Sequence, residues 1–298
     1  MVKSLPRWHE LSFLFAGYSI VAGSAWVLRS GLTTKALLAL GIHLVIAGLL
    51  VLTARKTSPG FEPPKVKIVM LAPWALWLMA WSEIGWLYES ATPEYFDQAV
   101  IQWDLMIFGR HLNELLPDLW SGGVLKELFT GFYISYYPLI LGPPLILALQ
   151  RRWSTLLNYT YAVMLTNLTC FAIYLVLPVL GPRDLTVTAE ALASSGSTGY
   201  FSQLMNTMFS LGNSIGTAFP SSHCAGSATA AYLCYRHFSW RTGLVCGVWA
   251  FLVVLSTIQT NNHYAIDALA AIGLVALVQA LEAYREKIVN HRSHRVHR

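Results

Sequence analysis

Charged residues are scarce in this chain of 298 residues: Asp, Glu, Lys and Arg together make up 12% of it, whereas 55% is hydrophobic. Soluble domains carry about 25% charged residues, so this shortage argues against an ordinary soluble protein and indicates that lipid is the main solvent. The net charge of +5 would by itself suit a nucleic-acid partner. Because the basic residues instead gather at the ends of apolar segments, we expect the lipid bilayer as partner and no nucleic acid.

Cysteine is also scarce, and its spacing matches no metal site. The cysteines are isolated within apolar segments: Cys170, Cys224, Cys234 and Cys246. We interpret them as small buried hydrophobic residues, which carry no information about the redox compartment. The chain also lacks internal repeats and low-complexity tracts, and its first apolar run is too long for a cleavable signal peptide and has no small-residue cleavage site. These features predict neither a bound metal nor a cofactor.

Long apolar runs, by contrast, are abundant. A helix needs about 20 mainly apolar residues to span a bilayer, and about eight segments approach this length. They are 11–29, 35–53, 67–88, 124–149, 156–178, 220–236, 242–260 and 263–284. The sequence thus predicts an all-α integral membrane protein. We expect a two-helix membrane segment at 1–66, a helical bundle with the candidate site at 67–286, and a disordered basic tail at 287–298.

Two longer connections separate the apolar segments. Residues 89–123 are acidic and partly amphipathic, which predicts a helix that lies on the membrane surface. Residues 179–219 are rich in Gly, Ser and Thr, which indicates an ordered loop or short helices.

The distribution of Lys and Arg predicts the orientation in the membrane. An even number of spans places both termini on one side, and most of the 20 Lys and Arg residues fall on that side. Since cytoplasmic loops carry the excess of Lys and Arg, we expect cytoplasmic termini. Arg183, His223 and His263 then lie together on the opposite face, which is periplasmic, extracellular or lumenal.

A histidine and an aspartate begin the last predicted span. His263 and Asp267 are four residues apart, so both side chains share one face of a helix. A carboxylate in this position can accept a hydrogen bond from one imidazole nitrogen and raise the basicity of the other. Such a histidine can attack phosphorus and form a phosphohistidine. The structural alternative is a pair that only caps a helix at the interface.

A second motif, Phe-Pro-Ser-Ser-His at 219–223, begins the sixth predicted span. Proline followed by hydroxyls is typical of a helix start, where unpaired N–H groups and the positive end of the helix dipole form an anion site. His223 would stand in that site as a general acid. Arg183, in Gly-Pro-Arg at 181–183, adds a fork of donors that suits phosphate. Alone, each of these pieces is explained by a helix cap or an interface anchor.

Taken in order, the motifs resemble those of the type 2 phosphatidic acid phosphatase superfamily. There the first motif is Lys-x6-Arg-Pro, the second Pro-Ser-Gly-His and the third Ser-Arg-x5-His-x3-Asp. The resemblance extends over roughly residues 120–285. It implies a helical bundle with its active site at the outer membrane interface.

The same resemblance implies a role for each motif residue. It implies that His263 is the nucleophile, that Asp267 orients it and that His223 is the general acid. It further implies that Arg183, Ser221 and Ser222 contact the phosphate.

The sequence departs from the superfamily pattern in all three motifs. The departures are Val176 at the lysine, Asp184 at the proline, Ser222 at the glycine and Thr257 at the arginine. The forms Phe-Pro-Ser-x-His and Gly-Pro-Arg, with His-Tyr-x-x-Asp lacking the upstream arginine, look more like the inositol phosphorylceramide synthase and sphingomyelin synthase branch. Members of that branch transfer a phosphate-bearing headgroup between lipids. A phosphomonoester is close to a dianion at neutral pH, whereas a phosphodiester carries one charge, so two missing cations favour a diester. Lys126 and Arg110 remain candidates to restore a charge.

We therefore predict an integral membrane lipid phosphotransferase or phosphatase that works through a phosphohistidine. Headgroup transfer is the favoured reaction, and hydrolysis of a lipid phosphomonoester or pyrophosphate is the alternative. A metal-dependent hydrolase with His223, His263 and Asp267 as zinc ligands is a further possibility, as is a non-catalytic lipid transporter or scaffold. No motif specifies the oligomeric state.

Other side chains receive weaker expectations. Asp104 is expected to be a solvated carboxylate on the surface helix, although a place beside the site is the alternative. Glu83 falls inside a span, where an ionisable side chain is a functional hypothesis, unless it lies near enough to the interface to be wet. His43 is expected to pair within the bundle. Tyr133, Tyr136 and Tyr137 are expected to pack as aromatic residues, with the lining of a lipid entry as the alternative.

Overall fold

The fold is built from helices. The computed structural model describes residues 7–56, 71–91, 94–119, 123–186, 199–212 and 215–296, and within these ranges it contains no strand beyond an isolated parallel bridge between Val179 and Thr217. The longer helices are α1 (Arg7–Ser30), α2 (Thr34–Lys56), α3 (Ala72–Ser90), α8 (Trp153–Val176), α12 (Ser222–His237), α13 (Trp240–Gln259) and α14 (Ala265–Val296). The shorter ones are α4 (Asp97–Phe108), α5 (Leu112–Leu119), α6 (Gly123–Ile134), α7 (Tyr136–Leu149), α9 (Pro182–Thr186) and α11 (Tyr200–Leu211). The predicted all-α class is confirmed.

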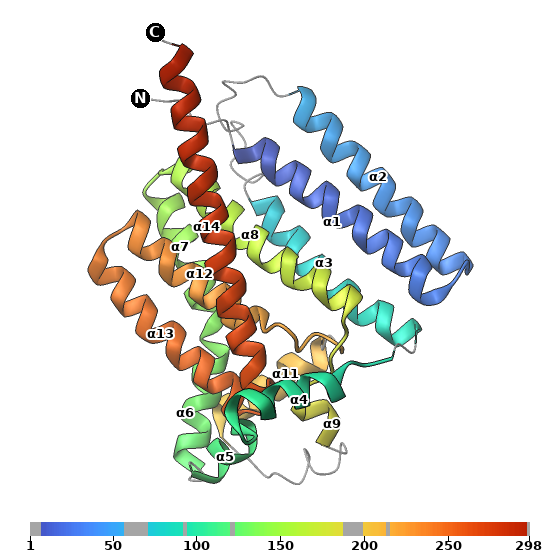
Figure 1. Cartoon of the computed structure of the whole chain (residues 1–298), viewed down its shortest axis with the longest axis vertical. Helices are drawn as coiled ribbons and strands as arrows, with labels where there is room; N and C mark the ends of the chain where they lie inside the picture. The colour runs from blue at the N-terminus through green and yellow to red at the C-terminus, as the bar shows by residue number, and fades with distance from the viewer. Residues whose placement is uncertain are drawn as a thin grey trace.

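Helix α8 is at the centre of the bundle. It contacts α1, α3, α7, α12 and α14, and its Phe171 and Tyr174 are completely buried (Figure 1). Helices α1 and α2 form a hairpin that packs on α8 through α1, so α2 lies at the edge. The exposed residues of α2 include Leu38 and Val45, as expected of a helix that faces lipid.

Within the described residues, six helical segments are long and apolar enough to cross a membrane. They are Arg7–Ser30, Thr34–Leu52, Gly123–Leu149, Trp153–Val176, Trp240–Gln259 and Ala265–Arg285. The other two predicted spans correspond to α3 and α12. Helix α12 has 16 residues, about 24 Å at 1.5 Å per residue, which is short against a hydrocarbon core of about 30 Å. Helix α3 carries Glu83 and Glu89 among its 19 residues, so its composition is less apolar. The predicted count of eight is therefore not confirmed.

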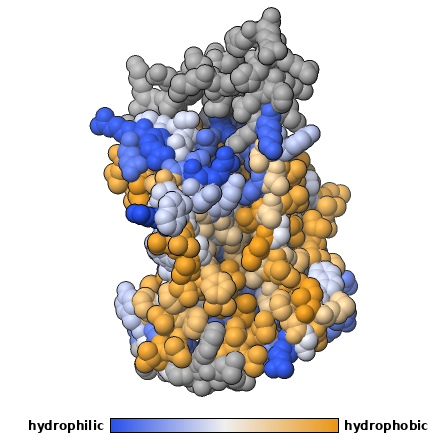
Figure 2. Space-filling view, turned by 60° about the vertical axis from the view of Figure 1, so that its left-hand side comes forward, coloured by the Kyte–Doolittle hydropathy of each residue, from blue (hydrophilic) through white to orange (hydrophobic). Residues whose placement is uncertain are grey.

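The distribution of apolar surface fits a membrane protein. In Figure 2 hydrophobic side chains cover most of the middle of the visible face, and hydrophilic side chains gather toward its two ends. This belt, together with the long apolar helices, supports an integral membrane protein.

The start of α1 and the end of α14 lie at one end of the bundle. Arg7 forms an ion pair with Glu282 at 2.9 Å, and Arg285 pairs with Glu10. Glu282 is almost five turns along α14 from Ala265, roughly 25 Å at 5.4 Å per turn. The two long connections, which contain α4, α5, α9 and α11, lie at the opposite end (Figure 1).

The structure also tests the predictions for the connections and the tail. Residues 179–219 contain α9 and α11, so the short helices expected there are confirmed. Residues 89–123 contain α4 and α5, and the position of these helices on the membrane surface stays a prediction. The tail differs from its prediction, because α14 continues to Val296 instead of ending near Lys287. No glycine or proline follows Gly273, so nothing in the sequence stops the helix.

Candidate functional site

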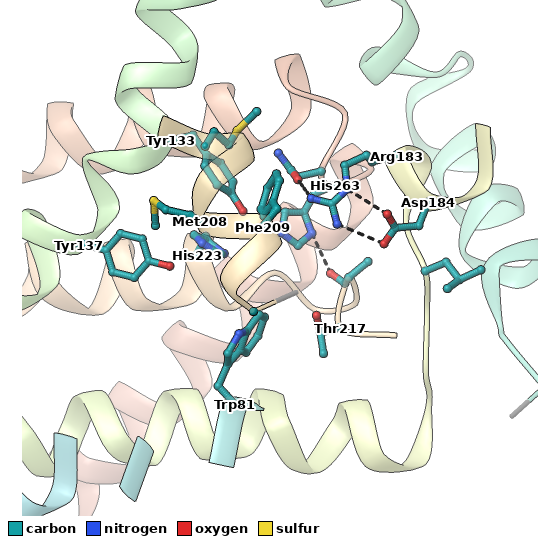
Figure 3. A pocket seen from close by; sticks show the side chains of 15 residues that line it. Trp81, Tyr133, Tyr137, Arg183, Asp184, Met208, Phe209, Thr217, His223 and His263 are labelled. Carbon is teal, nitrogen blue, oxygen red and sulfur yellow. Dashed lines mark hydrogen bonds and ion pairs between the residues drawn. The ribbon is translucent and has the colours of Figure 1, made fainter. Parts of the chain in front are cut away.

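A cavity of about 100 Å³ lies among helix ends and connecting loops (Figure 3). Its walls include residues of α9 and α11, which lie at the end of the bundle remote from the termini (Figure 1). Its polar lining consists of Arg183, Asp184, Thr217, His223, Asn262 and His263. Its apolar lining consists of Trp81, Tyr133, Tyr137, Leu180, Met205, Met208, Phe209, Gly212 and Ala218. The structure thus brings three predicted site residues, Arg183, His223 and His263, to one cavity.

Backbone hydrogen bonds join the segments that carry the first two motifs. The Val179 N–H donates to the Gly216 carbonyl at 3.2 Å, and the Ala218 N–H donates to the Val179 carbonyl at 2.9 Å. Gly181, between Val179 and Arg183, has a φ of +87°, and a Cβ atom there would lie 2.9 Å from the Cβ of Ala218. Only glycine combines this left-handed conformation with so close an approach. The Gly-Pro-Arg sequence therefore holds Arg183 against the segment that leads into His223.

His263 is oriented chiefly by a backbone carbonyl. Its Nδ1 atom lies 2.9 Å from the Ala218 carbonyl oxygen and 3.4 Å from Oδ2 of Asp267, whose Oδ2 also accepts the Tyr264 N–H at 2.8 Å. Asp267 is thus behind the imidazole, as the motif predicts, but the closer partner is Ala218. A proton on Nδ1 that is donated to this carbonyl leaves Nε2 unprotonated.

The protonation state of His263 suits a nucleophile. Burial lowers the pKa of His263 to about 4; the hydrogen bond to Ala218 opposes this shift and the charge of Arg183 adds to it. The imidazole is therefore neutral at pH 7, and its Nε2 lone pair is available to an electrophile.

His223 is held between aromatic rings. Its ring stacks on Tyr133 with centroids 4.7 Å apart and lies 4.5 Å from the ring centroid of Tyr136. Its Nδ1 atom is buried and has no hydrogen-bond partner among the described residues. The centroids of His223 and His263 are 6.1 Å apart, so one phosphoryl group can contact both rings. Tyr133 therefore both packs on a histidine and lines the cavity.

The two serines of the second motif do not line the cavity. Ser221 is the N-cap of α12, where its Oγ accepts the Cys224 N–H at 3.3 Å. Its own N–H donates to the Asp267 carbonyl at 3.1 Å, and the Ser222 N–H donates to the Tyr174 hydroxyl at 3.0 Å. These groups fasten the start of α12 to α14 and α8. In this structure the N–H groups of Ser221, Ser222 and Cys224 have partners within the protein, so the predicted anion site at this helix start is largely occupied.

Helix α4 connects the first and third motifs through two buried carboxylates. Asp97 accepts the N–H groups of Leu180 and Gly181, both at 3.0 Å. Asp104 accepts the Ile266 N–H at 2.9 Å, at the start of α14. Asp104 is 0% exposed, so the expectation of a solvated carboxylate is wrong.

The spacing of these two acids explains their burial. Asp97 and Asp104 are seven positions apart, which is about two helical turns and places both on one face of α4. Free N–H groups at a helix start, as at Ile266, attract a carboxylate. Two acids at this spacing on a predicted surface helix could have been recognised in the sequence.

Arg183 is surrounded by partners that no motif predicted. Its Nη1 donates to Oδ1 of Asn262 at 2.8 Å, and the adjacent Asp184 pairs with its Nε at 2.9 Å. The Phe209 ring lies over the guanidinium, with the carbon Cζ 4.2 Å from the ring centroid. Asn262 directly precedes His263, so one turn carries both a hydrogen-bond acceptor for Arg183 and the candidate nucleophile.

Comparison with known proteins gives one finding. A family model described as PAP2 superfamily matches residues 98–281, which is more than half of the chain. The chain belongs to the PAP2 superfamily. Neither the curated proteins nor the solved structures give a match. Membership of the PAP2 superfamily supports an enzyme that hydrolyses or transfers phosphate groups of lipids. The match begins within α4, so α1, α2 and α3 precede it.

The two positions at which the PAP2 motifs carry a further cation hold uncharged residues here. Val176, at the lysine position, is 69% exposed on the outside of α8. Thr257, at the arginine position, is fully buried, and its hydroxyl donates to the Val254 carbonyl at 2.8 Å. Lys126 and Arg110 are not among the residues that line the cavity. Of the described cavity residues, Arg183 alone is a permanent cation.

The proposed zinc ligands do not converge in this PAP2 chain. Asp267 lies on the Nδ1 side of His263, the side tied to Ala218, whereas His223 faces His263 from across the cavity. In the part of the chain that the structure describes, no three His, Cys, Asp or Glu side chains form a group fit for a metal ion. The geometry therefore gives no support to that alternative.

The remaining candidates lie away from the PAP2 motifs. Nε2 of His43 lies 2.5 Å from Oε1 of Glu83, and the same oxygen accepts the Trp26 indole N–H at 2.8 Å. The expected pairing of His43 within the bundle is confirmed. Glu83 does not line the cavity. Its contacts with Trp26 and His43 instead tie α3 to α1 and α2. All four cysteines are buried and unpaired by disulfides, as predicted.

Proposed function

We propose that the protein is an integral membrane lipid phosphotransferase that works through a phosphohistidine at His263. The observation that carries this proposal is the state of His263: a neutral imidazole, tied at Nδ1 to Ala218, in the wall of a cavity shared with Arg183 and His223. Superfamily membership supports the same class of chemistry.

The proposed reaction has two half-steps. Nε2 of His263 attacks the phosphorus of the donor, and the bond from phosphorus to the leaving alcohol breaks. His223 gives a proton to the departing oxygen, while Arg183 binds the phosphate oxygens. In the second half-step an acceptor hydroxyl attacks the phosphohistidine, its proton passes to His223, and His263 is regenerated.

The donor that we propose is a phosphodiester lipid, as in the inositol phosphorylceramide and sphingomyelin synthase branch. The absence of cavity cations at Val176 and Thr257 supports a monoanionic phosphate group. The apolar half of the cavity, which includes Trp81, Tyr137 and Met208, supports a lipid. Hydrolysis of a lipid phosphomonoester or pyrophosphate is the alternative, in which water takes the place of the acceptor hydroxyl.

We also propose that the termini are cytoplasmic and that the cavity opens on the opposite face. The support is the excess of Lys and Arg on the side of the termini, together with the separation of the termini from the cavity along α14. Alkaline phosphatase and green fluorescent protein fused after Arg298 test this orientation, since cytoplasmic termini predict fluorescence without phosphatase activity.

Product analysis tests the proposed reaction. Purified protein is offered a labelled phosphodiester lipid and a labelled phosphomonoester lipid, each with and without an acceptor lipid, and the products are identified by mass spectrometry. We expect a new phosphorylated lipid and an acid-labile adduct on His263, both lost in His263→Ala. Free phosphate from the monoester would instead identify a phosphatase, and full turnover by His263→Ala would rule out the mechanism.

A further inference from the structure

The Arg183–Asp184 pair in the cavity wall has a feature that the catalytic scheme does not use. Asp184 accepts from Nε of Arg183 at 2.9 Å through Oδ1 and from Nη2 at 3.2 Å through Oδ2. This bidentate contact occupies one edge of the guanidinium (Figure 3). Both side chains line the cavity, so a phosphate group bound by Arg183 also meets the carboxylate of Asp184.

The contact changes the charge that a substrate encounters. Among the described cavity residues, Arg183 is the only permanent cation and Asp184 is the only carboxylate. His263 is neutral and Asp184 offsets the charge of Arg183, so the only further charge of the lining is the proton that His223 carries as general acid. Asn262 and Asp184 together fix the plane of the guanidinium, because they hold Nη1, Nε and Nη2.

We propose that Asp184 is a specificity-determining residue that makes the site select a monoanionic phosphodiester over a dianionic phosphomonoester. The inference rests on the function proposed above and assigns its substrate class to a named side chain. One negative charge on the phosphate is balanced by Arg183. A second charge is repelled by the carboxylate of Asp184, at a distance where partly buried charges interact strongly. Rejection of the wrong ligand by a like charge is an effective source of specificity.

The test compares two chromogenic probes, bis(p-nitrophenyl) phosphate as the diester and p-nitrophenyl phosphate as the monoester. The measured quantity is the ratio of kcat/KM for the monoester to kcat/KM for the diester, with purified full-length protein. Asp184→Asn keeps the size of the side chain and removes its charge. We expect this variant to raise the ratio about tenfold, which corresponds to about 1.4 kcal/mol.

The control is Glu114→Gln. Glu114 is an exposed acid on α5 that does not line the cavity, so its loss changes the net charge equally without touching Arg183. We expect its ratio to equal that of the wild type. A ratio that is unchanged in Asp184→Asn, or that rises equally in both variants, overturns the inference.

A measurement on the wild-type protein covers the case in which Asp184→Asn does not fold. A phosphonate and its monomethyl ester are compared as competitive inhibitors across a range of pH. We expect inhibition by the phosphonate to strengthen as the pH falls below its second pKa, whereas inhibition by the ester stays constant. Equal or better inhibition by the dianion would overturn the inference. Failure of the proposed function looks different, because full turnover in His263→Ala removes the mechanism whatever the probe ratio.

Discussion

Two histidines of this protein lie beside a carboxylate inside the bundle, and their surroundings differ. His43 is in direct contact with Glu83 at 2.5 Å, among the tightly packed helices α1, α2 and α3. His263 has its carboxylate, Asp267, at 3.4 Å behind the ring, and its ring borders a cavity that also contains Arg183. The other ring nitrogen of His43, Nδ1, is buried without a hydrogen-bond partner among the described residues, so this histidine has no open space beside it. A histidine with one nitrogen tied and the other turned to open space is equipped for chemistry.

The strongest test of this comparison exchanges each histidine for glutamine. We expect His263→Gln to lower kcat by at least about 10³-fold, because removal of a nucleophile abolishes the covalent step. His43→Gln is the matched control and should retain near wild-type turnover per folded molecule. Labelled product formation by both purified variants measures the difference. Equal losses would show that the two sites do not differ in kind.

Substitutions of Asp97 and Asp104 on α4 test whether the two carboxylates position different parts of the functional site. Asp104→Ala removes the acceptor of the Ile266 N–H at the start of α14, and we expect kcat to fall about 10- to 100-fold with little change in KM, since small displacements of a reacting group are costly. Asp97→Ala removes both acceptors of the loop before Arg183, so KM should rise more than kcat falls. Asp104→Glu should recover part of the activity, and Glu114→Gln should have no effect. An identical change of kcat and KM in both variants would contradict separate positioning roles.

Substitutions in the cluster of His43, Glu83 and Trp26 should change the stability of the protein and leave its turnover unchanged. Glu83→Ala leaves the Trp26 indole and the His43 imidazole without their acceptor, and we expect the free energy of unfolding to fall by about 1–2 kcal/mol. Thermal unfolding in detergent measures this loss. Glu89→Ala, at an exposed position of the same helix, is the control. A loss of turnover in Glu83→Ala that exceeds the loss of folded protein would show that this cluster contributes to function as well as to stability.

The smallest expected effect is that of mild acid on the reactivity of His263. The imidazole reacts in its neutral form, and because burial lowers its pKa to about 4, the neutral form is lost only as the pH falls through 4. In His223→Gln, the rate at which diethyl pyrocarbonate modifies His263 should therefore change by less than about twofold between pH 7 and pH 5. A profile that bends near pH 6.5, the usual pKa of histidine, would show that the imidazole is solvated in the free enzyme.

Local sequence patterns account for the fold class and for most of the motif positions. Apolar length predicted the helices, and the spacing of His263 and Asp267 predicted a shared helix face. The same reasoning misplaced Asp104, because an acid on an amphipathic helix is usually solvated and its partner Ile266 is 162 residues away. Its count of eight spans is not confirmed, since α12 has only 16 residues.

The sequence by itself determined that the chain is a helical membrane protein and which histidines, arginine and aspartate belong to the candidate site. Only the tertiary structure decided how they act together. The carbonyl of Ala218 is the nearest partner of His263, the serines of the second motif fasten α12 instead of lining the cavity, and Asp184 faces the same space as Arg183. The physical reason is the sequence separation over which each interaction acts. Helix periodicity and hydropathy act between near neighbours, whereas the charge and hydrogen-bond balance of a cavity depends on residues that only folding brings together.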